Sequence, residues 1–520
     1  MVIKKRKNSN FFHHYKKIFS PNLKKNMLVL MHILDSHVQK IVDPCVMVIF
    51  GATGDLTQKR LFPALYNLSF EGLLPLNFAC LSFARKEKTD AFFREEIKQT
   101  SLTGQCASCV DAFLQKIFYL QANFDNDDGY VHLKEQLSLF DKKFGTKQNR
   151  LFYLATPPKY FATIVEKLYF HKLLYSHHEN LQRWSRVIIE KPFGHDLLSA
   201  QTLQNILLKY LSEKQIFRID HYLGKETVQN IFAIRFANPL FESIWNHNHI
   251  DHVQITVAED SGIGGRGTFF EETGILRDVM QNHMMQLLSL IAMEPPQNFS
   301  SSKVREAKVN LLKSIRPIKK QDVIRGQYDR GFIQGNPVLG YREELNISKT
   351  SSVETYGAIK LHIDNDRWKN VPFYLRAGKR LPKKISEIAI VFKDSPSCRF
   401  LKNSNNVLAI SIQPQESIAL KINCKVPFDA AITQPVKMEF SYKDHFGLVT
   451  IEAYAKLIHE CMLDNHTLFI SDKETLYSWK IFSPIISMWN NTKANDFPNY
   501  QAGSWGPKDK LLGNKKWRLL

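Results

Sequence analysis

An apolar, mostly β-branched run that leads straight into a glycine turn constrains the fold of this chain more than any other segment. Residues 46–50 read Val-Met-Val-Ile-Phe, and the turn Gly51-Ala-Thr-Gly-Asp-Leu56 follows at once. A continuous apolar run is typical of a buried parallel strand. A helical pattern with leucines on one face then extends from about Lys59 to Phe70. This order predicts a dinucleotide-binding α/β domain, because bare glycines admit a pyrophosphate and the helix N-terminus attracts its charge.

The turn departs from the usual Gly-x-Gly-x-x-Gly fingerprint, since Thr53 and Leu56 replace two glycines. No Gly-Lys-Ser/Thr follows, so it is not a Walker loop. The next apolar run, residues 78–83, is followed by Ala-Arg85-Lys86 without an acid. NAD sites usually have an acid there, whereas the 2′-phosphate of NADP calls for a cation. We therefore predict NADP, held by Arg85 with Lys86 as a helper; a pair of solvated strand-end charges is the alternative.

A second strand-like run delivers a lysine to the edge where ligands bind in open α/β sheets. Residues 187–189 are apolar, and Glu-Lys191-Pro192 follows. A residue before proline is restricted to extended backbone, so Lys191 is predicted to point out of the strand into the crevice. Residues 151–158 form a similar apolar strand that is predicted to end beside the cofactor.

Residues 218–225, Arg-Ile-Asp-His-Tyr-Leu-Gly-Lys, collect an acid, an imidazole, a phenol and an ammonium group in one short segment. His221, Tyr222 and Lys225 can donate hydrogen bonds to an anion, and charge-assisted bonds of this kind suit a phosphate. Asp220 is a candidate for orienting a base elsewhere in the chain. A solvated polar turn is the alternative interpretation.

Together these motifs resemble the signatures of glucose-6-phosphate dehydrogenases. The resemblance begins near Val46, extends to about Pro507 and includes an Ala-Arg pair at residues 84–85; Thr156 is a mild departure, because the family usually has an apolar residue there. It implies that Lys191 contacts both cofactor and substrate and that the peptide before the following proline is cis. The implied cofactor contacts are Gly51, Thr53, Gly54, Asp55, Leu56, Arg85 and Lys191.

The resemblance also assigns a catalytic base. Residues 275–287 are predicted to form a largely buried helix, in which His283 by itself would be an ordinary core histidine. The segment Arg-Asp-Val-Met-Gln-Asn-His at 277–283 is similar to the one that carries the family's catalytic histidine. His283 is therefore assigned as general base, and Asp220 as the carboxylate that holds its tautomer. His221 is the rival, but its place in the signature fits phosphate binding.

Four further side chains carry over as substrate contacts. Glu259 and Asp278 match family positions beside the glucose ring, although the sequence after Glu259 departs from the family pattern. Lys379 carries over as a contact near the ring, and Lys384 falls where the family has a lysine or arginine near the phosphate. Lys383 is the alternative to Lys384, and a basic surface loop is the alternative for the pair.

The implied reaction is the oxidation of β-D-glucose 6-phosphate at C1 to 6-phosphogluconolactone, with hydride transfer to NADP⁺ and no metal. This is the first oxidative step of the pentose phosphate pathway. A dehydrogenase that accepts hexose 6-phosphates more broadly is the alternative enzyme.

The net charge of +20 raises an alternative of a different class, a basic nucleic-acid-binding protein on an inactive dehydrogenase scaffold. Eight of these charges lie in residues 1–25, and removing them leaves +12. The other basic residues are scattered and no nucleic-acid module is present, so we expect no nucleic-acid partner.

A chain of 520 residues with 44% hydrophobic residues exceeds one typical core. The α/β alternation extends to about residue 220, which predicts a Rossmann-like NADP-binding domain at 41–220. Several later strand-like runs predict a mainly antiparallel sheet with helices on one side, in a substrate and dimerisation domain at 221–520. The resemblance implies a homodimer or homotetramer. The runs are residues 252–258, 356–363, 387–392 and 407–413.

Residues 1–40 are basic and lie outside the resemblance, so we expect a disordered extension, with a transit peptide or an upstream start codon as alternatives. The apolar stretch Met27–Leu34 is too short to span a membrane. An odd count of seven cysteines favours reduced thiols and a cytoplasmic location. Cys106-x-x-Cys109 has no second pair, so we do not expect zinc there.

Overall fold

The computed structural model describes residues 42–175, 183–394, 404–427, 432–446, 452–508, 510–518 and 520. The basic extension expected at 1–40, with its apolar stretch Met27–Leu34, lies outside the described residues. Among the helices of the described part, none has both the length and the apolar character needed to cross a membrane.

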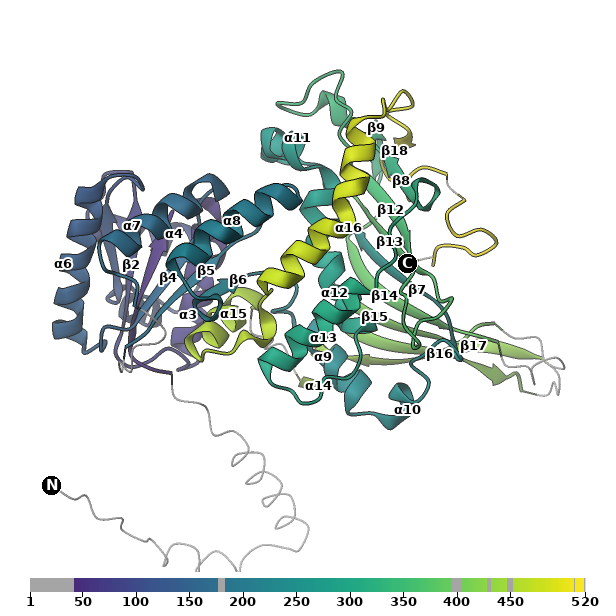
Figure 1. Cartoon of the computed structure of the whole chain (residues 1–520), viewed down its shortest axis with the longest axis horizontal. Coiled ribbons are helices and arrows are strands. Elements are labelled where there is room, and N and C mark those ends of the chain that lie inside the picture. Colours follow the sequence, from purple (N-terminus) through teal and green to yellow (C-terminus); the bar gives the residue numbers. More distant parts are fainter. Residues whose placement is uncertain are drawn as a thin grey trace, which may run out of the picture. The chain divides into compact units, whose positions relative to one another are not determined.

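The first part of the described chain is built on a six-stranded parallel sheet in the order β3-β2-β1-β4-β5-β6 (Figure 1). Every residue of β1 is buried, as expected for a strand covered on both faces. The order reverses between β1 and β4, and such a switch point is where ligands bind in open α/β sheets. The strands are β1 (Cys45–Phe50), β2 (Phe78–Ala84), β3 (Ile117–Gln121), β4 (Arg150–Leu154), β5 (Ser185–Ile189) and β6 (Ile216–Arg218).

The helix after the glycine turn begins earlier than the leucine pattern predicts. The π-helix η1 (Thr57–Leu61) continues directly into α3 (Phe62–Phe70), whereas the pattern placed the start near Lys59. The Gly54 N–H donates to the Gly51 carbonyl at 3.0 Å and closes the turn, so helical winding starts immediately after it. The other helices of this part are α4 (Asp90–Thr100), α5 (Ala107–Leu114), α6 (Asp127–Phe144), α7 (Phe161–Phe170) and α8 (Leu197–Tyr210).

The second part contains an eight-stranded sheet in the order β17-β16-β15-β14-β7-β13-β12-β8. All neighbours are antiparallel except β13 and β7, which confirms the predicted mainly antiparallel sheet. Each of the four predicted runs is a strand, with ends shifted by a few residues at most. The strands are β7 (Ile250–Ala258), β8 (Val323–Gly326), β12 (Tyr356–Leu361), β13 (Phe373–Gly378), β14 (Ile385–Phe392), β15 (Val407–Gln413), β16 (Ser417–Lys425) and β17 (Thr433–Ser441).

A helix that is buried at every position from Ile275 to Ala292 except Arg277 lies against this sheet. The predicted helix at 275–287 is continuous from the end of α11 (Gly267–Ile275) through η5 (Leu276–Met284) into α12 (Met285–Ala292), but η5 is wound as a π-helix. It packs very closely on β12, since a Cβ added at Gly357 would lie 2.7 Å from Met280 Sδ. Figure 1 shows α12, α13 (Ser301–Lys313) and α16 (Asp472–Asn490) gathered at this side of the sheet.

The remaining elements are short or peripheral. The helices are α9 (Glu226–Phe236), α10 (Pro239–Glu242), α14 (Tyr442–Phe446) and α15 (Ala453–Met462). The single-turn helices are η2 (Pro158–Tyr160), η3 (Glu213–Gln215), η4 (Gly264–Arg266), η6 (Lys320–Asp322), η7 (Tyr341–Glu343) and η9 (His466–Leu468). The short strands are β9 (Tyr328–Asp329), β10 (Gly331–Ile333), β11 (Asn336–Val338) and β18 (Tyr500–Gln501).

Candidate active site

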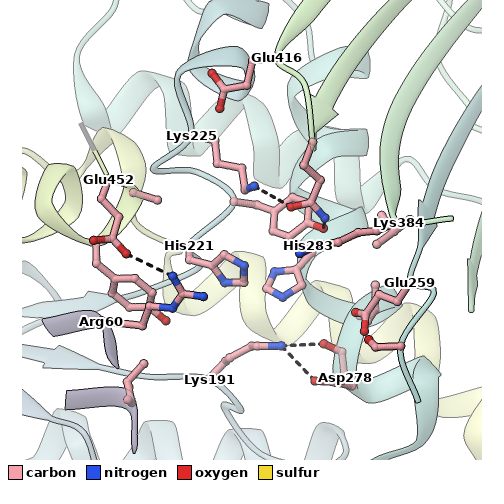
Figure 2. Close-up of a pocket in the computed structure, with 18 of the residues that line it drawn as sticks. Arg60, Lys191, His221, Lys225, Glu259, Asp278, His283, Lys384, Glu416 and Glu452 are labelled. Carbon is pink, nitrogen blue, oxygen red and sulfur yellow. Dashed lines mark hydrogen bonds and ion pairs between the residues drawn. The ribbon is translucent and has the colours of Figure 1, made fainter. Parts of the chain in front are cut away.

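A cavity of about 570 Å³ brings most of the predicted substrate residues together. It is lined from the end of β5, the turn after β6, the end of β7, η5 and the start of β14. Figure 2 shows two imidazole rings at its centre, with Lys191 and Asp278 on one side of them and Lys225 on the other. The predicted residues at its wall are Lys191, His221, Tyr222, Lys225, Glu259, Asp278, His283 and Lys384.

His283 and Asp220 form a buried pair at the back of this cavity. His283 Nδ1 lies 2.5 Å from Asp220 Oδ1, and both side chains are almost fully buried. The Tyr222 N–H donates to the same carboxylate oxygen at 2.9 Å. These groups are 63 residues apart in sequence, and the turn after β6 brings them into contact.

The protonation of the pair follows from its surroundings. Burial by itself would raise the pKa of Asp220, but the charge and hydrogen bond of His283 lower it below its ordinary value. Burial lowers the pKa of His283 below 6.5, and the Asp220 charge only partly opposes this. At neutral pH Asp220 is therefore ionised and His283 is neutral. Because Nδ1 faces Asp220, Nε2 is the nitrogen left to accept a proton.

His221 and Tyr222 pack directly on the base. The His221 and His283 ring centroids are 4.6 Å apart, and the Tyr222 ring stacks on His283 at 4.5 Å. Burial, and then the neighbouring His283, lower the pKa of His221 well below its ordinary value, so His221 is a neutral donor. The Tyr222 hydroxyl lies 3.0 Å from Ser386 Oγ. Ligand atoms of Asp220, His221 and His283 fall within 4.8 Å of one another, a spacing that a metal could also use. The direct bond between two of the three is the arrangement of an acid–base pair.

The cations form one end of the cavity. Lys225 Nζ donates to Gln413 Oε1 at 2.8 Å. Burial lowers the Lys225 pKa, and Glu416 opposes this shift. Lys384 lines the cavity with an exposed side chain, whereas Lys383 is not among the lining residues. This favours Lys384 as the residue placed to meet a phosphate.

Carboxylates lie on the other side of the base. Lys191 Nζ donates to the Asp278 backbone carbonyl at 2.7 Å and to its Oδ1 at 3.2 Å. Although burial opposes it, the charges of Lys191 and Lys379 lower the pKa of Asp278 below its ordinary value. Lys379 is fully buried and does not line the cavity itself; it reaches the wall through Glu259, with Nζ 2.7 Å from Oε2. The carboxylate oxygens of Glu259 and Asp278 are acceptors suited to sugar hydroxyls.

Several lining residues were not predicted from the sequence. Arg60 lies on η1 and its Nη1 is 3.5 Å from Glu452 Oε1. Their positions near the cations depend on contacts between distant segments, so no local pattern marks them. Gln413 is the exception: it is the last residue of β15, and a polar residue at the end of a predicted strand could have marked it as a candidate. The lining residues without a sequence prediction include Arg60, Gln413, Glu416, Glu452 and Tyr454.

A second cavity, of about 330 Å³, lies at the carboxyl ends of β4 and β5 beside the glycine turn. The two cavities share four wall residues, and one of these is Lys191, so this lysine borders both. The Lys191-Pro192 peptide is cis, as the resemblance implied. Thr156 is buried and also lines this cavity. The shared residues are Leu56, Lys191, Arg266 and Asp278.

The glycine turn has the geometry of a dinucleotide cradle. Gly51 has φ +88°, and a Cβ there would lie 2.4 Å from the Ala155 carbonyl oxygen, so no other residue fits. Its N–H donates to the Phe83 carbonyl at 2.9 Å, which ties the turn to the end of β2. Arg85 and Lys86 follow that end with exposed side chains. Thr53 is half-buried and Gly54 exposed, and exposed Asp55 pairs with Lys59.

Comparisons with known proteins agree with this architecture. The family model "Glucose-6-phosphate dehydrogenase, NAD binding domain" matches residues 48–230, and "Glucose-6-phosphate dehydrogenase, C-terminal domain" matches 232–518. Glucose-6-phosphate 1-dehydrogenase of Chlamydia muridarum is 52% identical over 491 residues, covering 91% of this chain and 97% of the relative. The Bacillus subtilis enzyme of that name is 41% identical over 472 residues, covering 89% and 95%.

A solved structure of glucose-6-phosphate dehydrogenase in complex with glucose 6-phosphate superposes with a TM-score of 0.82. Its sequence is 38% identical, and the match covers 91% of this chain and 96% of that one. Both halves of the described fold and nearly the whole length of these relatives are therefore accounted for. The chain belongs to the glucose-6-phosphate dehydrogenase family.

Proposed function

We propose that this chain oxidises β-D-glucose 6-phosphate at C1 to 6-phosphogluconolactone, with NADP⁺ as hydride acceptor, in the first oxidative step of the pentose phosphate pathway. The observation that carries the proposal is the buried pair of neutral His283 and ionised Asp220 between a cationic pocket and a dinucleotide cradle. The family comparisons support the sugar phosphate as substrate. No step in this scheme needs a metal.

The base acts on the hydroxyl of C1. His283 Nε2 takes the hydroxyl proton while the hydride leaves the same carbon, and Asp220 stabilises the imidazolium that forms. The pair is already aligned and buried, so little reorganisation accompanies the proton transfer. A bound nicotinamide supplies the hydride acceptor.

Substrate contacts divide between the two sides of the base. Phosphate is held by His221, Tyr222, Lys225 and Lys384, where cations and neutral donors converge. Sugar hydroxyls are met by Glu259 and Asp278, which are oriented by ion pairs with Lys379 and Lys191. Binding energy from the phosphate thus orients C1 towards the base.

The cofactor is held by the turn from Gly51 to Leu56 and by Lys191, which borders both cavities. Gly51 is required to be glycine, because a Cβ there would clash with the Ala155 carbonyl, and the bare backbone of such a turn is what a pyrophosphate needs. NADP is preferred to NAD, because Arg85 follows the strand to which the turn is bonded.

We also propose the domain bounds, the location and the oligomeric state of the enzyme. Residues 41–220 form the NADP-binding domain and 221–520 the substrate domain, in a cytoplasmic homodimer or homotetramer. Strand β17 supports assembly through the large sheet, because it is an edge strand with exposed Val436 and Met438 on one face.

The deciding experiment follows the absorbance of reduced nicotinamide with glucose 6-phosphate and NADP⁺ or NAD⁺, in the wild type and in His283→Asn. We expect turnover with NADP⁺ and a loss of kcat of about 10²–10⁴-fold in the variant, with little change in KM for the sugar. Galactose 6-phosphate and unphosphorylated glucose serve as competing substrates. A folded wild-type enzyme without turnover, or a His283→Asn enzyme with near-full kcat, would contradict the proposal.

A further inference from the structure

Two cysteines three residues apart stand at the start of helix α5, away from both cavities. Cys106 is the N-cap residue of α5 and is exposed, and Cys109 lies in the first turn and is half-buried. Residues i and i+3 at a helix start are neighbours on one face. A disulfide needs Cα atoms within about 7 Å, and residues three apart at the start of a helix lie within that distance.

The Cys106 sulfur is activated by its neighbours. It lies 3.4 Å from Ser108 Oγ. The Ser108 hydrogen bond, followed by the two from Cys109, lowers the pKa of Cys106 to about 7. The hydrogen bond with Cys106 raises the pKa of Cys109. A thiol whose pKa is near the ambient pH is the best attacking group in thiol–disulfide exchange.

Three other cysteines provide a contrast within the same chain. Cys45, Cys80 and Cys461 are fully buried. Burial raises the pKa of Cys45 and of Cys80 to about 12, and raises that of Cys461 as well. These thiols are therefore inert and serve as internal controls.

We propose that Cys106 and Cys109 form a redox-active dithiol that exchanges with low-molecular-weight disulfides of the glutathione class. The Cys106 thiolate attacks one sulfur of the disulfide, whose S–S bond breaks, and one thiol leaves with a proton. The Cys109 thiolate then attacks the Cys106 sulfur and releases the second thiol. The two cysteines lose two protons and two electrons, and one external disulfide is reduced to two thiols. A pair of this type in a reducing compartment is typical of a transient redox role.

One side chain connects this site to the glycine turn. Ser101, in the segment between α4 and α5 that leads to Cys106, donates from Oγ to Gln58 Oε1 at 2.8 Å. Gln58 Nε2 in turn donates to the Ala52 carbonyl at 3.1 Å. Closing a disulfide is expected to shift Cys106, which precedes the first helical residue, and the segment that leads to it. The shift would disturb the hydrogen bonds that join Ser101, Gln58 and Ala52. With the proposed function, the oxidised enzyme is expected to have a KM for NADP⁺ about two- to tenfold higher, equivalent to the loss of one hydrogen bond.

The exchange itself is tested without any activity. The full-length protein is equilibrated with mixtures of reduced and oxidised glutathione, and the remaining thiols are alkylated. The masses of the tryptic peptides are then measured by mass spectrometry. Both cysteines lie in the peptide of residues 99–116, bounded by Lys98 and Lys116. We expect this peptide to lose two hydrogens and resist alkylation as the oxidised fraction grows, while the peptides with Cys45 and Cys80 stay reduced.

Two single variants separate the roles of the thiols. Cys109→Ser should trap one glutathione on Cys106, because the resolving thiol is gone, whereas Cys106→Ser should leave Cys109 largely unmodified. Both variants should keep the activity of the reduced wild type. A 99–116 peptide that stays a dithiol in excess glutathione disulfide would overturn the proposal. So would equal glutathionylation of the two variants. An unchanged KM for NADP⁺ after complete oxidation would overturn the connection through Gln58.

Discussion

The two ends of the active-site cavity are built on opposite principles. Around His283 the groups are buried and already paired: Asp220 holds the ring at 2.5 Å, and Tyr222 stacks on it. At the cationic end, Lys384 is exposed, and the hydrogen bond that Lys225 makes within the described residues goes to the neutral Gln413. The end around His283 is therefore preorganised for proton transfer, whereas the cationic end keeps its positive charge available for an incoming anion. Substitutions at the first end should reduce turnover, and those at the second should reduce affinity.

The largest effect is expected at the preorganised end. In Asp220→Asn the imidazolium formed during turnover loses its counter-charge, so kcat should fall about 10²–10⁴-fold while KM for glucose 6-phosphate changes little. Steady-state kinetics with both substrates varied measures this. A variant with wild-type kcat would show that the pair is structural.

Substitutions at the cationic end should change KM for glucose 6-phosphate more than kcat. In Lys225→Ala, KM for glucose 6-phosphate should rise about 10- to 100-fold, the value of a charge-assisted hydrogen bond, with a smaller change in kcat. Lys384→Ala should show a weaker rise, because the side chain is exposed. Lys383→Ala is the matched control, and a rise there equal to that of Lys384→Ala would remove the distinction between the two lysines.

The exposed cations at the end of β2 sharpen the comparison for the cofactor. Arg85→Ala should raise KM for NADP⁺ about tenfold while leaving any turnover with NAD⁺ unchanged, because only NADP⁺ carries the 2′-phosphate. Lys86→Ala should have a smaller effect of the same sign. Equal losses with both cofactors would argue that Arg85 stabilises the fold of the turn instead.

The smallest effect is a shift in pH dependence. His283 must be neutral to act as a base, so kcat/KM should fall as the pH decreases through its pKa, which burial places below 6.5. The Asp220 charge raises that pKa, so the residual activity of Asp220→Asn should show its acid limb at still lower pH. The pH profile of kcat/KM checks this, and an acid limb that moves upward would contradict the assignment.

Local patterns predicted the strand, glycine turn and helix, because each element is specified by neighbouring residues. The partnership of His283 with Asp220 came only from the resemblance, since no periodicity links residues 63 positions apart. Arg60, Gln413 and Glu416 were missed for the same reason: they meet the cavity through long-range packing. The π-helical winding was also missed, because apolar spacing does not distinguish it from an α-helix over two turns.

That winding sets the angular phase of the active-site helix. Asp278 and His283 are five residues apart on η5, and both line the cavity. In an α-helix this separation turns the second side chain well away from the first, but a π-helix closes its hydrogen bonds over five residues and brings the two into line. Deleting one residue from this segment, or stiffening it into regular α-helix, would leave either the carboxylate proposed to bind the sugar or the proposed base facing the protein interior. One wide helical turn thus places Asp278, the proposed acceptor for the sugar hydroxyls, and His283, the proposed acceptor for the proton, on the same face of the helix.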